Sequence, residues 1–189
     1  NILNIKNVLI ENLMKENERL AKKVQFLESH VKKVDIEVHA LESYDRRNNL
    51  EFEGIPSDIP DSKLEHIVIS ICNSIGVKVE KSEIEDCHRI GRKQNPKVIT
   101  RFVNRKHCKT AIKNRKMLKT SDKTEIGLPE NTKIFINENM SPYFNHLAYR
   151  CRVLQRAKKI SSHYFLNGKL YKVRTPGERS INISHIDNI

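Results

Sequence analysis

The sequence predicts an α+β protein with an N-terminal coiled coil, a βαββαβ domain and a small α+β C-terminal domain. Three observations favour this class. Heptad spacing of apolar residues fills the first 45 residues, strand-like and helical patterns alternate over residues 46–139, and an Asn-Gly hairpin signal follows a basic helix near the end of the chain. The expected domains are therefore residues 1–45, 46–139 and 140–189.

The first segment has apolar residues at alternating spacings of three and four, and no Pro or Gly occurs before Gly54. The a and d positions are Ile10, Leu13, Asn17, Leu20, Val24, Leu27, Val31, Val34, Val38 and Leu41. A lone helix cannot bury such a stripe, so we expect homo-oligomerisation through a coiled coil rather than one helix folded against the globular part. Valine at a with leucine at d favours a dimer, whereas Lys23 at g and Glu28 at e also suit three strands. The heptads alone leave dimer and trimer open.

Residues 50–56 alternate apolar and polar side chains and stop at a proline, which predicts a strand. Its inward side chains are Leu50, Phe52 and Ile55. Ser62 and Glu65 have the spacing of a capping box at the start of an amphipathic helix, and Gly76 is its expected C-terminal cap.

Residues 84–90, 97–104 and 134–137 predict three more strands, and residues 91–96 predict a loop. A basic helix is expected over residues 105–118. Its inner stripe is Cys108, Ala111, Ile112 and Leu118. The resulting order is βαββαβ, the split βαβ pattern of ferredoxin-like folds, which include the RNA-recognition motif.

Ser141 followed by Pro142 predicts the start of a helix over residues 142–160. One side of that helix is apolar, with Phe144, Leu147, Ala148, Cys151, Leu154 and Ala157. The other side is basic, with Arg150, Arg152, Arg156, Lys158 and Lys159.

Asn167 and Gly168 separate two alternating segments, residues 162–166 and 169–174, and predict a β-hairpin. Residues 180–183 are a candidate third strand. This unit is small for independent folding, so we expect it to pack against the domain that precedes it.

The positive charge is concentrated in the C-terminal half. Residues 91–189 contain 22 Lys and Arg against 6 Asp and Glu, whereas residues 1–45 and 46–90 have net charges of −1 and −3. Solubility needs far less charge than this, so the pattern favours a phosphate-backbone partner over a merely solvated surface. No apolar stretch is long enough to span a membrane, and no basic amphipathic helix with exposed aromatics favours a membrane surface.

The four cysteines, Cys72, Cys87, Cys108 and Cys151, form no CxxC pair. Together with the lack of a signal-peptide pattern, this predicts reduced, mostly buried thiols in a cytoplasmic or nuclear protein. The sequence has no nucleophile elbow, phosphate-binding Gly loop or HExxH motif, and Asp86 and His88 have no Ser or Cys at a useful position. We therefore expect no enzymatic activity, no metal and no cofactor.

The expected partner is single-stranded RNA, with DNA as an alternative. Residues 97–103 lack the aromatic pattern with which RNA-recognition motifs stack bases, so Phe52 and Phe102 are expected in the core. Phosphate contacts then supply most of the affinity, which predicts strong salt dependence and little sequence preference.

The candidate nucleic-acid-binding residues are basic or aromatic. They are Arg46, Arg47, Arg101, Arg105, Lys106, Lys109, Lys113, Arg150, Arg152, Arg156, Lys159, Tyr164, Tyr171, Lys172 and Arg174. Arg46 and Arg47 also suit charge compensation at the end of the first helix. A packing role for Tyr164 and Tyr171 is as consistent with the sequence as base stacking is.

Several segments resemble one known family. The run Tyr-Asp-Arg-Arg-Asn-Asn-Leu-Glu-Phe-Glu-Gly-Ile-Pro at residues 44–56 is similar to a run in the first-open-reading-frame proteins of insect LINE-type (non-LTR) retrotransposons. Residues 87–91, 97–102 and 134–138 resemble later elements of that family more weakly. The baculovirus few-polyhedra proteins look like relatives with the same layout.

The resemblance implies a trimerising coiled coil, an RNA-recognition-like domain and a small C-terminal domain. It implies a non-enzymatic nucleic-acid chaperone that coats single-stranded RNA in ribonucleoprotein particles. The RNA path of the family falls approximately on Arg46, Arg47, Arg101, Arg105, Arg150 and Lys159. A preference for trimer over dimer rests on this resemblance. The alternative function is a structural assembly scaffold, like the viral relatives, whose basic half binds acidic proteins.

Overall fold

A computed structural model describes residues 2–91 and 96–186 of the chain. Most of the loop predicted over residues 91–96 therefore lies outside the described residues. The chain divides into two compact units, Asn1–Leu41 and Glu42–Ile189. None of the helices in the described part combines the length and hydrophobicity that crossing a membrane requires.

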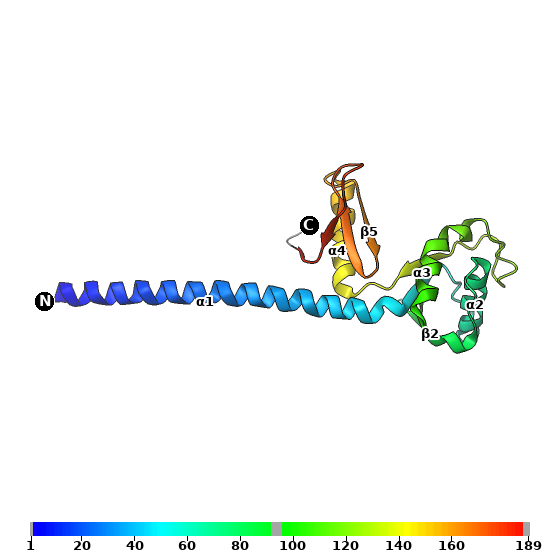
Figure 1. The fold of residues 1–189 in the computed structure, drawn as a ribbon, viewed down its shortest axis with the longest axis horizontal. Coiled ribbons are helices and arrows are strands. Elements are labelled where there is room, and N and C mark those ends of the chain that lie inside the picture. Colours follow the sequence, from blue (N-terminus) through cyan, green and yellow to red (C-terminus); the bar gives the residue numbers. More distant parts are fainter. Residues whose placement is uncertain (1, 92–95, 187–189) are drawn as a thin grey trace. The chain divides into compact units, whose positions relative to one another are not determined.

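The long N-terminal helix predicted by the heptads is present as α1, Ile2–Asp45 (Figure 1). Its last four residues belong to the second unit. The apolar heptad side chains are exposed on the single chain, from 42% at Val34 to 69% at Leu41. Exposure of this extent over one continuous stripe is the situation that association of helices relieves.

The second unit contains a four-stranded antiparallel sheet. Its strands are β1 (Asn49–Glu53), β2 (Ile84–Ile90), β3 (Lys97–Phe102) and β4 (Phe135–Glu138), arranged in the order β2-β3-β1-β4. All four predicted strands are confirmed. Phe52 pairs with Val98 on one side and with Ile136 on the other, which places three apolar residues side by side on one face.

Two helices contribute to the core under that face, α2 (Leu64–Ser74) and α3 (Arg105–Asn114). The fully buried side chains include Leu50, Phe52, Leu64, Ile71, Val98, Phe102 and Ala111. Burial of these large apolar groups is the main stabilising contribution to the domain. The mixed α+β class is thus confirmed.

The capping box predicted at Ser62 and Glu65 is wrong. Residues Asp61–Lys63 form a 3-10 turn, and α2 begins after Lys63 without a side-chain cap. The reciprocal capping pair lies instead at Glu80 and Glu83, around the 3-10 turn that precedes β2.

The predicted cap at Gly76 is confirmed. Its φ of +76° is in the left-handed region, where glycine has no steric cost. The backbone N–H groups of Gly76 and Val77 donate to Asn73 and Cys72, which closes α2 as a Schellman motif. The basic helix α3 is shorter than predicted, because the chain tightens after Asn114 into a 3-10 helix, η4 (Arg115–Lys119).

The C-terminal part of this unit has its own hydrophobic cluster. It is built from α4 (Pro142–Arg156), β5 (Ser162–Leu166), β6 (Lys169–Val173) and β7 (Ile181–Ile183). The buried members are Phe144, Leu147, Ala148, Cys151, Ile160, Leu170 and Ile183. The two clusters of the second unit fall within residues 46–139 and 140–189, whereas the exact domain boundaries stay predictions.

The predicted β5–β6 hairpin is confirmed, with positive φ at both Asn167 (53°) and Gly168 (76°). The helix predicted to residue 160 ends earlier, at Arg156. Lys158 has a φ of 56°, and Lys159 N–H donates to the Leu154 carbonyl, so a left-handed residue terminates α4.

Candidate nucleic-acid interface

The helix-free face of the β2-β3-β1-β4 sheet is electrically neutralised and offers little for RNA. Lys97 Nζ lies 2.9 Å from Glu51 Oε2 and 2.8 Å from Glu53 Oε1. Burial alone would lower the pKa of Lys97, but Glu53 and Glu51 outweigh it and the pKa is raised. Phe52 and Phe102 are fully buried on the opposite face, which confirms that they are core residues.

Arg101 was predicted to contact nucleic acid, but its guanidinium is engaged with carboxylates. Arg101 Nε donates to Glu85 Oε2 at 2.9 Å, and Nη2 lies 3.7 Å from Asp45 Oδ1. A cation that already has two carboxylate neighbours attracts a phosphate less strongly. Arg101 therefore belongs with the neutralised sheet face.

Arg46 is held in a hydrogen-bonded network. Its Nη1 donates to Asn139 Oδ1 at 3.0 Å, and its Nη2 is 3.0 Å from Glu42 Oε1. Asn139 in turn donates from Nδ2 to Glu51 Oε1 at 2.7 Å, and Glu51 is only 7% exposed. This network satisfies a buried carboxylate, so Arg46 has a structural use beside any role with RNA.

Arg47 lies in a different environment from its neighbour. Its guanidinium carbon is 3.1 Å from the centroid of the Tyr44 ring, a cation–π contact that leaves the charge unneutralised. Tyr44 is 60% exposed, and no carboxylate pairs with Arg47 among the described residues. Arg47 therefore keeps its charge available.

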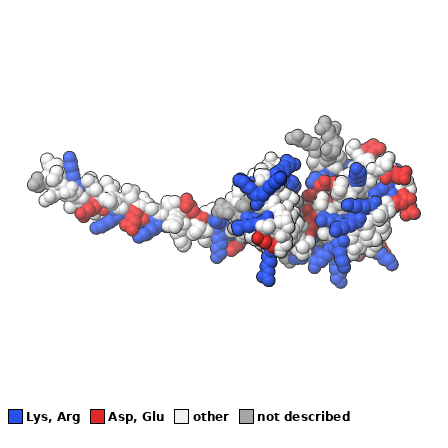
Figure 2. Space-filling model, turned by 90° about the horizontal axis from the view of Figure 1, so that it is seen from above, with Lys and Arg blue, Asp and Glu red and all other residues white. Residues whose placement is uncertain are grey.

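The segment from α3 through η4 is the most strongly cationic part of the unit. Its cations are Arg105, Lys106, Lys109, Lys113, Arg115, Lys116 and Lys119, and it contains no Asp or Glu. Asn104 caps α3 through a 2.9 Å bond from Lys106 N–H to Asn104 Oδ1. Arg105 and Lys106 stand in the first helical turn, where the helix dipole disfavours cations, so helix stability does not account for them. On the face shown in Figure 2, Lys and Arg predominate over the second unit.

A cleft of about 510 Å³ lies beside α3, and we call it the α3 cleft. It is lined by Arg47, Arg105, Cys108, Lys109, Ile112, Lys113, Glu138, Leu166 and Asn167. Four of these residues are cations and one is an acid. The structure thus brings together four sequence-predicted site residues, namely Arg47, Arg105, Lys109 and Lys113.

The one carboxylate in the α3 cleft has partners of its own. Glu138 accepts hydrogen bonds from the backbone N–H groups of Asn167 (3.0 Å) and Gly168 (3.2 Å). Glu138 therefore connects the hairpin turn to the end of β4. The two N–H donors of the turn partly compensate the negative charge of the Glu138 carboxylate. Sequence reasoning missed Glu138, because nothing in its neighbourhood signals a partner about thirty residues away.

The predicted cations of α4 are exposed and do not line the α3 cleft. Arg150, Arg152 and Arg156 lie on α4, and Lys159 follows its end. The Ser141 cap is confirmed by the bond from Phe144 N–H to Ser141 Oγ. These four residues form a second basic group that is separate from the cleft lining.

The two predicted tyrosines face each other across the hairpin. Tyr164 and Tyr171 are paired in register, and their rings stack at 5.2 Å between centroids with an interplanar angle of 18°. The Tyr164 hydroxyl donates to Ser180 Oγ at 2.8 Å, and Tyr164 remains 41% exposed. The packing role is therefore present, whereas base stacking on the exposed part of Tyr164 stays a prediction.

Lys172 differs from the prediction because it is buried rather than a surface cation. It is 4% exposed and lies on the same face of β6 as the buried Leu170. Burial, and then the charge of Arg174, lower its pKa. The two-residue period of the strand, which places Lys172 on the same face as Leu170, is the sequence signal that could have predicted this burial. Arg174 lies beyond the strand and is exposed.

All four cysteines are free, and three of them are buried, as predicted. Burial is the main cause that raises the pKa of Cys72 and of Cys108 to about 12, so neither thiol is a nucleophile at neutral pH. Within the described ranges, no group of three His, Cys, Asp or Glu side chains is arranged to hold a metal ion.

No protein-family model matches the chain, and a search of curated proteins gives no match. The resemblance to retrotransposon and few-polyhedra proteins therefore stays a prediction.

Proposed function

We propose that the protein is a non-enzymatic, oligomeric protein that binds single-stranded RNA through its phosphates. The observation that carries this proposal is the unbroken cationic segment Arg105 to Lys119, without one carboxylate, beside a cleft that Arg47 also lines. Contacts of this kind position a nucleic acid without reading its sequence. Sequence-tolerant binding suits a nucleic-acid chaperone that forms ribonucleoprotein particles in the cytoplasm or nucleus.

We further propose that residues 46–139 are an RNA-recognition-motif-like domain. The strand order β2-β3-β1-β4, with one helix between β1 and β2 and another between β3 and β4, supports this assignment. The domain would then bind RNA by an unusual surface, because its sheet face carries the Lys97–Glu51 and Lys97–Glu53 ion pairs in place of aromatic rings. Binding through α3 is the consequence.

The exposed apolar stripe of α1 supports oligomerisation through a coiled coil. We propose a homotrimer, following the family resemblance. An oligomer places several α3 clefts on one particle, and multivalent contact raises overall affinity without any new type of contact. Weak individual phosphate contacts then suffice for stable coating of RNA.

A filter-binding titration at increasing salt tests the proposed function. Binding to single-stranded RNA should weaken steeply, with a slope of roughly −0.7 per phosphate contact in a plot of log affinity against log salt. An affinity that does not change with salt would contradict a phosphate-driven interaction.

The second candidate function is an assembly scaffold whose basic half binds acidic proteins. The strong net charge of residues 91–189 is the observation that favours it, since carboxylates and phosphates are both attracted. Co-purification with and without nuclease separates the two functions. A scaffold keeps its partners after RNA digestion, whereas an RNA-coating protein loses them.

A further inference from the structure

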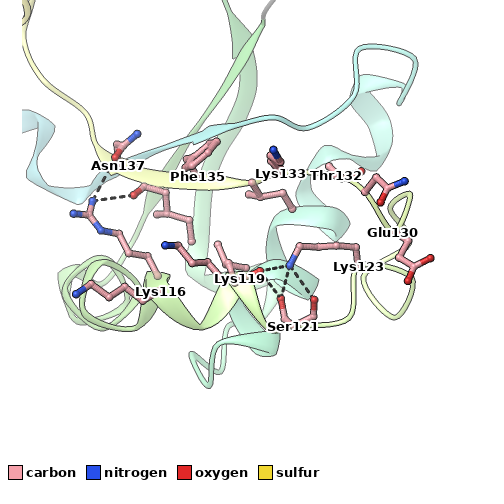
Figure 3. Close-up of a pocket in the computed structure, with 14 residues that line it drawn as sticks. Lys116, Lys119, Ser121, Lys123, Glu130, Thr132, Lys133, Phe135 and Asn137 are labelled. Atoms are coloured by element: carbon pink, nitrogen blue, oxygen red, sulfur yellow. Dashed lines mark hydrogen bonds between the residues drawn. The ribbon is translucent and has the colours of Figure 1, made fainter.

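A second hollow lies between η4 and β4, away from the α3 cleft, and we call it the η4–β4 groove. Its volume is about 700 Å³, within the range of ligand-binding pockets. Figure 3 shows residues of η4 and the following turn on one side and residues of β4 and the segment before it on the other. None of the groove-lining residues discussed below is among the candidate nucleic-acid-binding residues predicted from the sequence.

Three lysines give the groove its charge. Lys116, Lys119 and Lys133 are exposed, and their ammonium groups have no hydrogen-bond or ion-pair partner within the described residues. Glu130 is the one acidic residue in the lining. The groove therefore carries uncompensated positive charge that is suited to a polyanion.

The two other cations in the groove, Lys123 and Arg115, have hydrogen-bond partners within the protein. Lys123 is buried, and its ammonium group donates to the carbonyl oxygens of Leu118 and Ser121 and to Ser121 Oγ (Figure 3). It closes the turn after η4 and holds one side of the groove in shape. Gly54, at φ +94°, fixes the opposite side, because a Cβ there would clash with the carbonyl oxygen of Lys133.

An exposed aromatic ring accompanies these charges. Phe135 on β4 is 55% exposed, whereas its neighbours Ile134 and Ile136 are 7% and 1% exposed. Strand alternation puts the two isoleucines in the core and Phe135 on the other face. Figure 3 shows Phe135 and Lys133 on one side of β4, and Lys116 and Lys119 of η4 on the other side. An exposed phenylalanine on an edge strand with unpaired lysines on both sides of that strand has the composition of a base-stacking site in single-strand binders.

Arg115 blocks part of the open edge of β4, which disfavours the addition of a peptide strand there. β4 is an edge strand, and an unpaired edge is a template for a peptide. Arg115 Nη1 donates to the outward Ile136 carbonyl at 3.1 Å and to Asn137 Oδ1 at 3.3 Å. The guanidinium occupies the place where a docking peptide would donate its own N–H, so a peptide strand is the less suitable occupant.

We propose that the η4–β4 groove is a second nucleic-acid subsite, which stacks a base of single-stranded RNA on Phe135 and holds the adjoining phosphates with Lys133 on the same side of β4 and with Lys116 and Lys119 across its open edge. This proposal rests on the proposed RNA-binding function and extends the bound strand beyond the α3 cleft. It also assigns base stacking to the edge of the sheet rather than to its central strands.

The chain has no tryptophan, which allows a direct test. Phe135→Trp introduces a single indole in the groove, and stacking of a base quenches its fluorescence. The matched control is Met117→Trp, because Met117 is 50% exposed on η4 and does not line the groove. Each full-length variant is titrated with oligouridylate, with an abasic phosphodiester oligomer of equal length, and with oligoglutamate.

We expect oligouridylate to quench the indole at position 135 strongly and the one at position 117 weakly, with little quenching by the abasic oligomer. Phe135→Ala should lower affinity for oligouridylate about tenfold, the size of one lost base stack. Equal quenching by the abasic oligomer, or by oligoglutamate, would overturn the stacking assignment.

A parallel titration of the cleft variant Lys109→Ala/Lys113→Ala separates this inference from the proposed function. If that variant binds RNA weakly while oligouridylate does not quench the indole of the Phe135→Trp chain, the groove proposal fails and the α3 cleft stands. If the cleft variant and Phe135→Ala both bind RNA as tightly as the parent chain, both proposals fail.

Discussion

Arg46 donates a 3.0 Å hydrogen bond from Nη1 to Oδ1 of Asn139, ninety-three positions further along the chain. The amide of Asn139 donates to the buried Glu51, and the same arginine is paired with Glu42. These contacts connect the end of α1 to β1 and to the residue after β4. The two adjacent arginines therefore have different roles, because Arg47 lies against the Tyr44 ring and lines the α3 cleft.

Arg46→Ala should destabilise the protein more than it weakens RNA binding. The substitution removes charge-assisted bonds to Glu42 and Asn139 and leaves the Asn139 side-chain oxygen without this donor, a cost of about 1–3 kcal/mol in the free energy of unfolding. Arg47→Ala should do the reverse, with little loss of stability and a clear loss of affinity. Denaturant unfolding followed by circular dichroism, and filter binding on the same samples, measure the two effects. Identical behaviour of the two variants would contradict this division.

The α3 cleft gives a quantitative prediction for salt. Lys109→Ala/Lys113→Ala should lower affinity for single-stranded RNA and reduce the salt slope by roughly 1.4, or about 0.7 for each lost phosphate contact. The control is Lys63→Ala/Lys78→Ala, which removes the same charge from exposed sites outside the cleft lining. If both pairs change the slope equally, net charge rather than the cleft determines binding.

The sequence predicted the strands and the Gly76 and Ser141 caps because these depend on local patterns. Alternation gave β1 and β3, and Asn-Gly gave the hairpin. The Glu80–Glu83 capping pair was missed since glutamate is an uncommon cap. The Glu80–Glu83 pair can form its reciprocal bonds because a 3-10 turn follows Glu80. Ser62 and Glu65 have the spacing of a capping box, but Ser62 lies inside a 3-10 turn and not at a helix N-cap.

The candidate site was less predictable, because it depends on contacts between distant segments. No local signal places Glu51 in a buried network with Asn139, or Arg47 in the lining of a cleft formed by α3 and the hairpin turn. The cationic run itself was visible in the sequence. Which of its members are free and which are paired, as Arg101 is with Glu85, required the structure.

Two substitutions of Tyr164 distinguish a packing role from a base-stacking role. Tyr164→Phe loses the bond to Ser180 but keeps the ring that stacks on Tyr171, so RNA affinity should be nearly unchanged. Tyr164→Leu should weaken binding by about 1–3 kcal/mol, the contribution of a stacked base. Affinities from filter binding, with unfolding curves as the control for stability, check this. Equal affinity of the leucine and phenylalanine variants would assign Tyr164 to packing alone.

His163 makes stability depend on pH. Burial, and then the charge of Arg152, lower the pKa of His163 from its ordinary value of 6.5. The unfolded chain therefore takes up a proton at higher pH than the folded chain does. The stability that the neutral side chain contributes is present above pH 6.5 and is lost as pH falls through the folded pKa.

Urea unfolding at about pH 7.5 and at about pH 5.5 measures that dependence. His163→Gln, which keeps a polar group beside Gln155, should flatten it. A parent chain whose stability changes with pH no more than that of this variant would show that His163 is not the responsible group.

The central claim is that a helical stalk holds several cationic surfaces together on one RNA strand. Leu20→Ser/Leu27→Ser removes two d positions of the stripe without changing charge, and Ile5→Ser/Phe26→Ser removes two exposed apolar groups that lie off it. The first variant should dissociate, and the second should keep the oligomeric state of the parent chain.

Sedimentation and RNA affinity, measured on the same samples of these full-length variants, test the claim most directly. The account predicts that the dissociated variant binds RNA about 10²-fold or more weakly, since multivalency is lost. The off-stripe control should bind as the parent chain does. A dissociated chain that binds RNA as tightly as the oligomer would contradict the account.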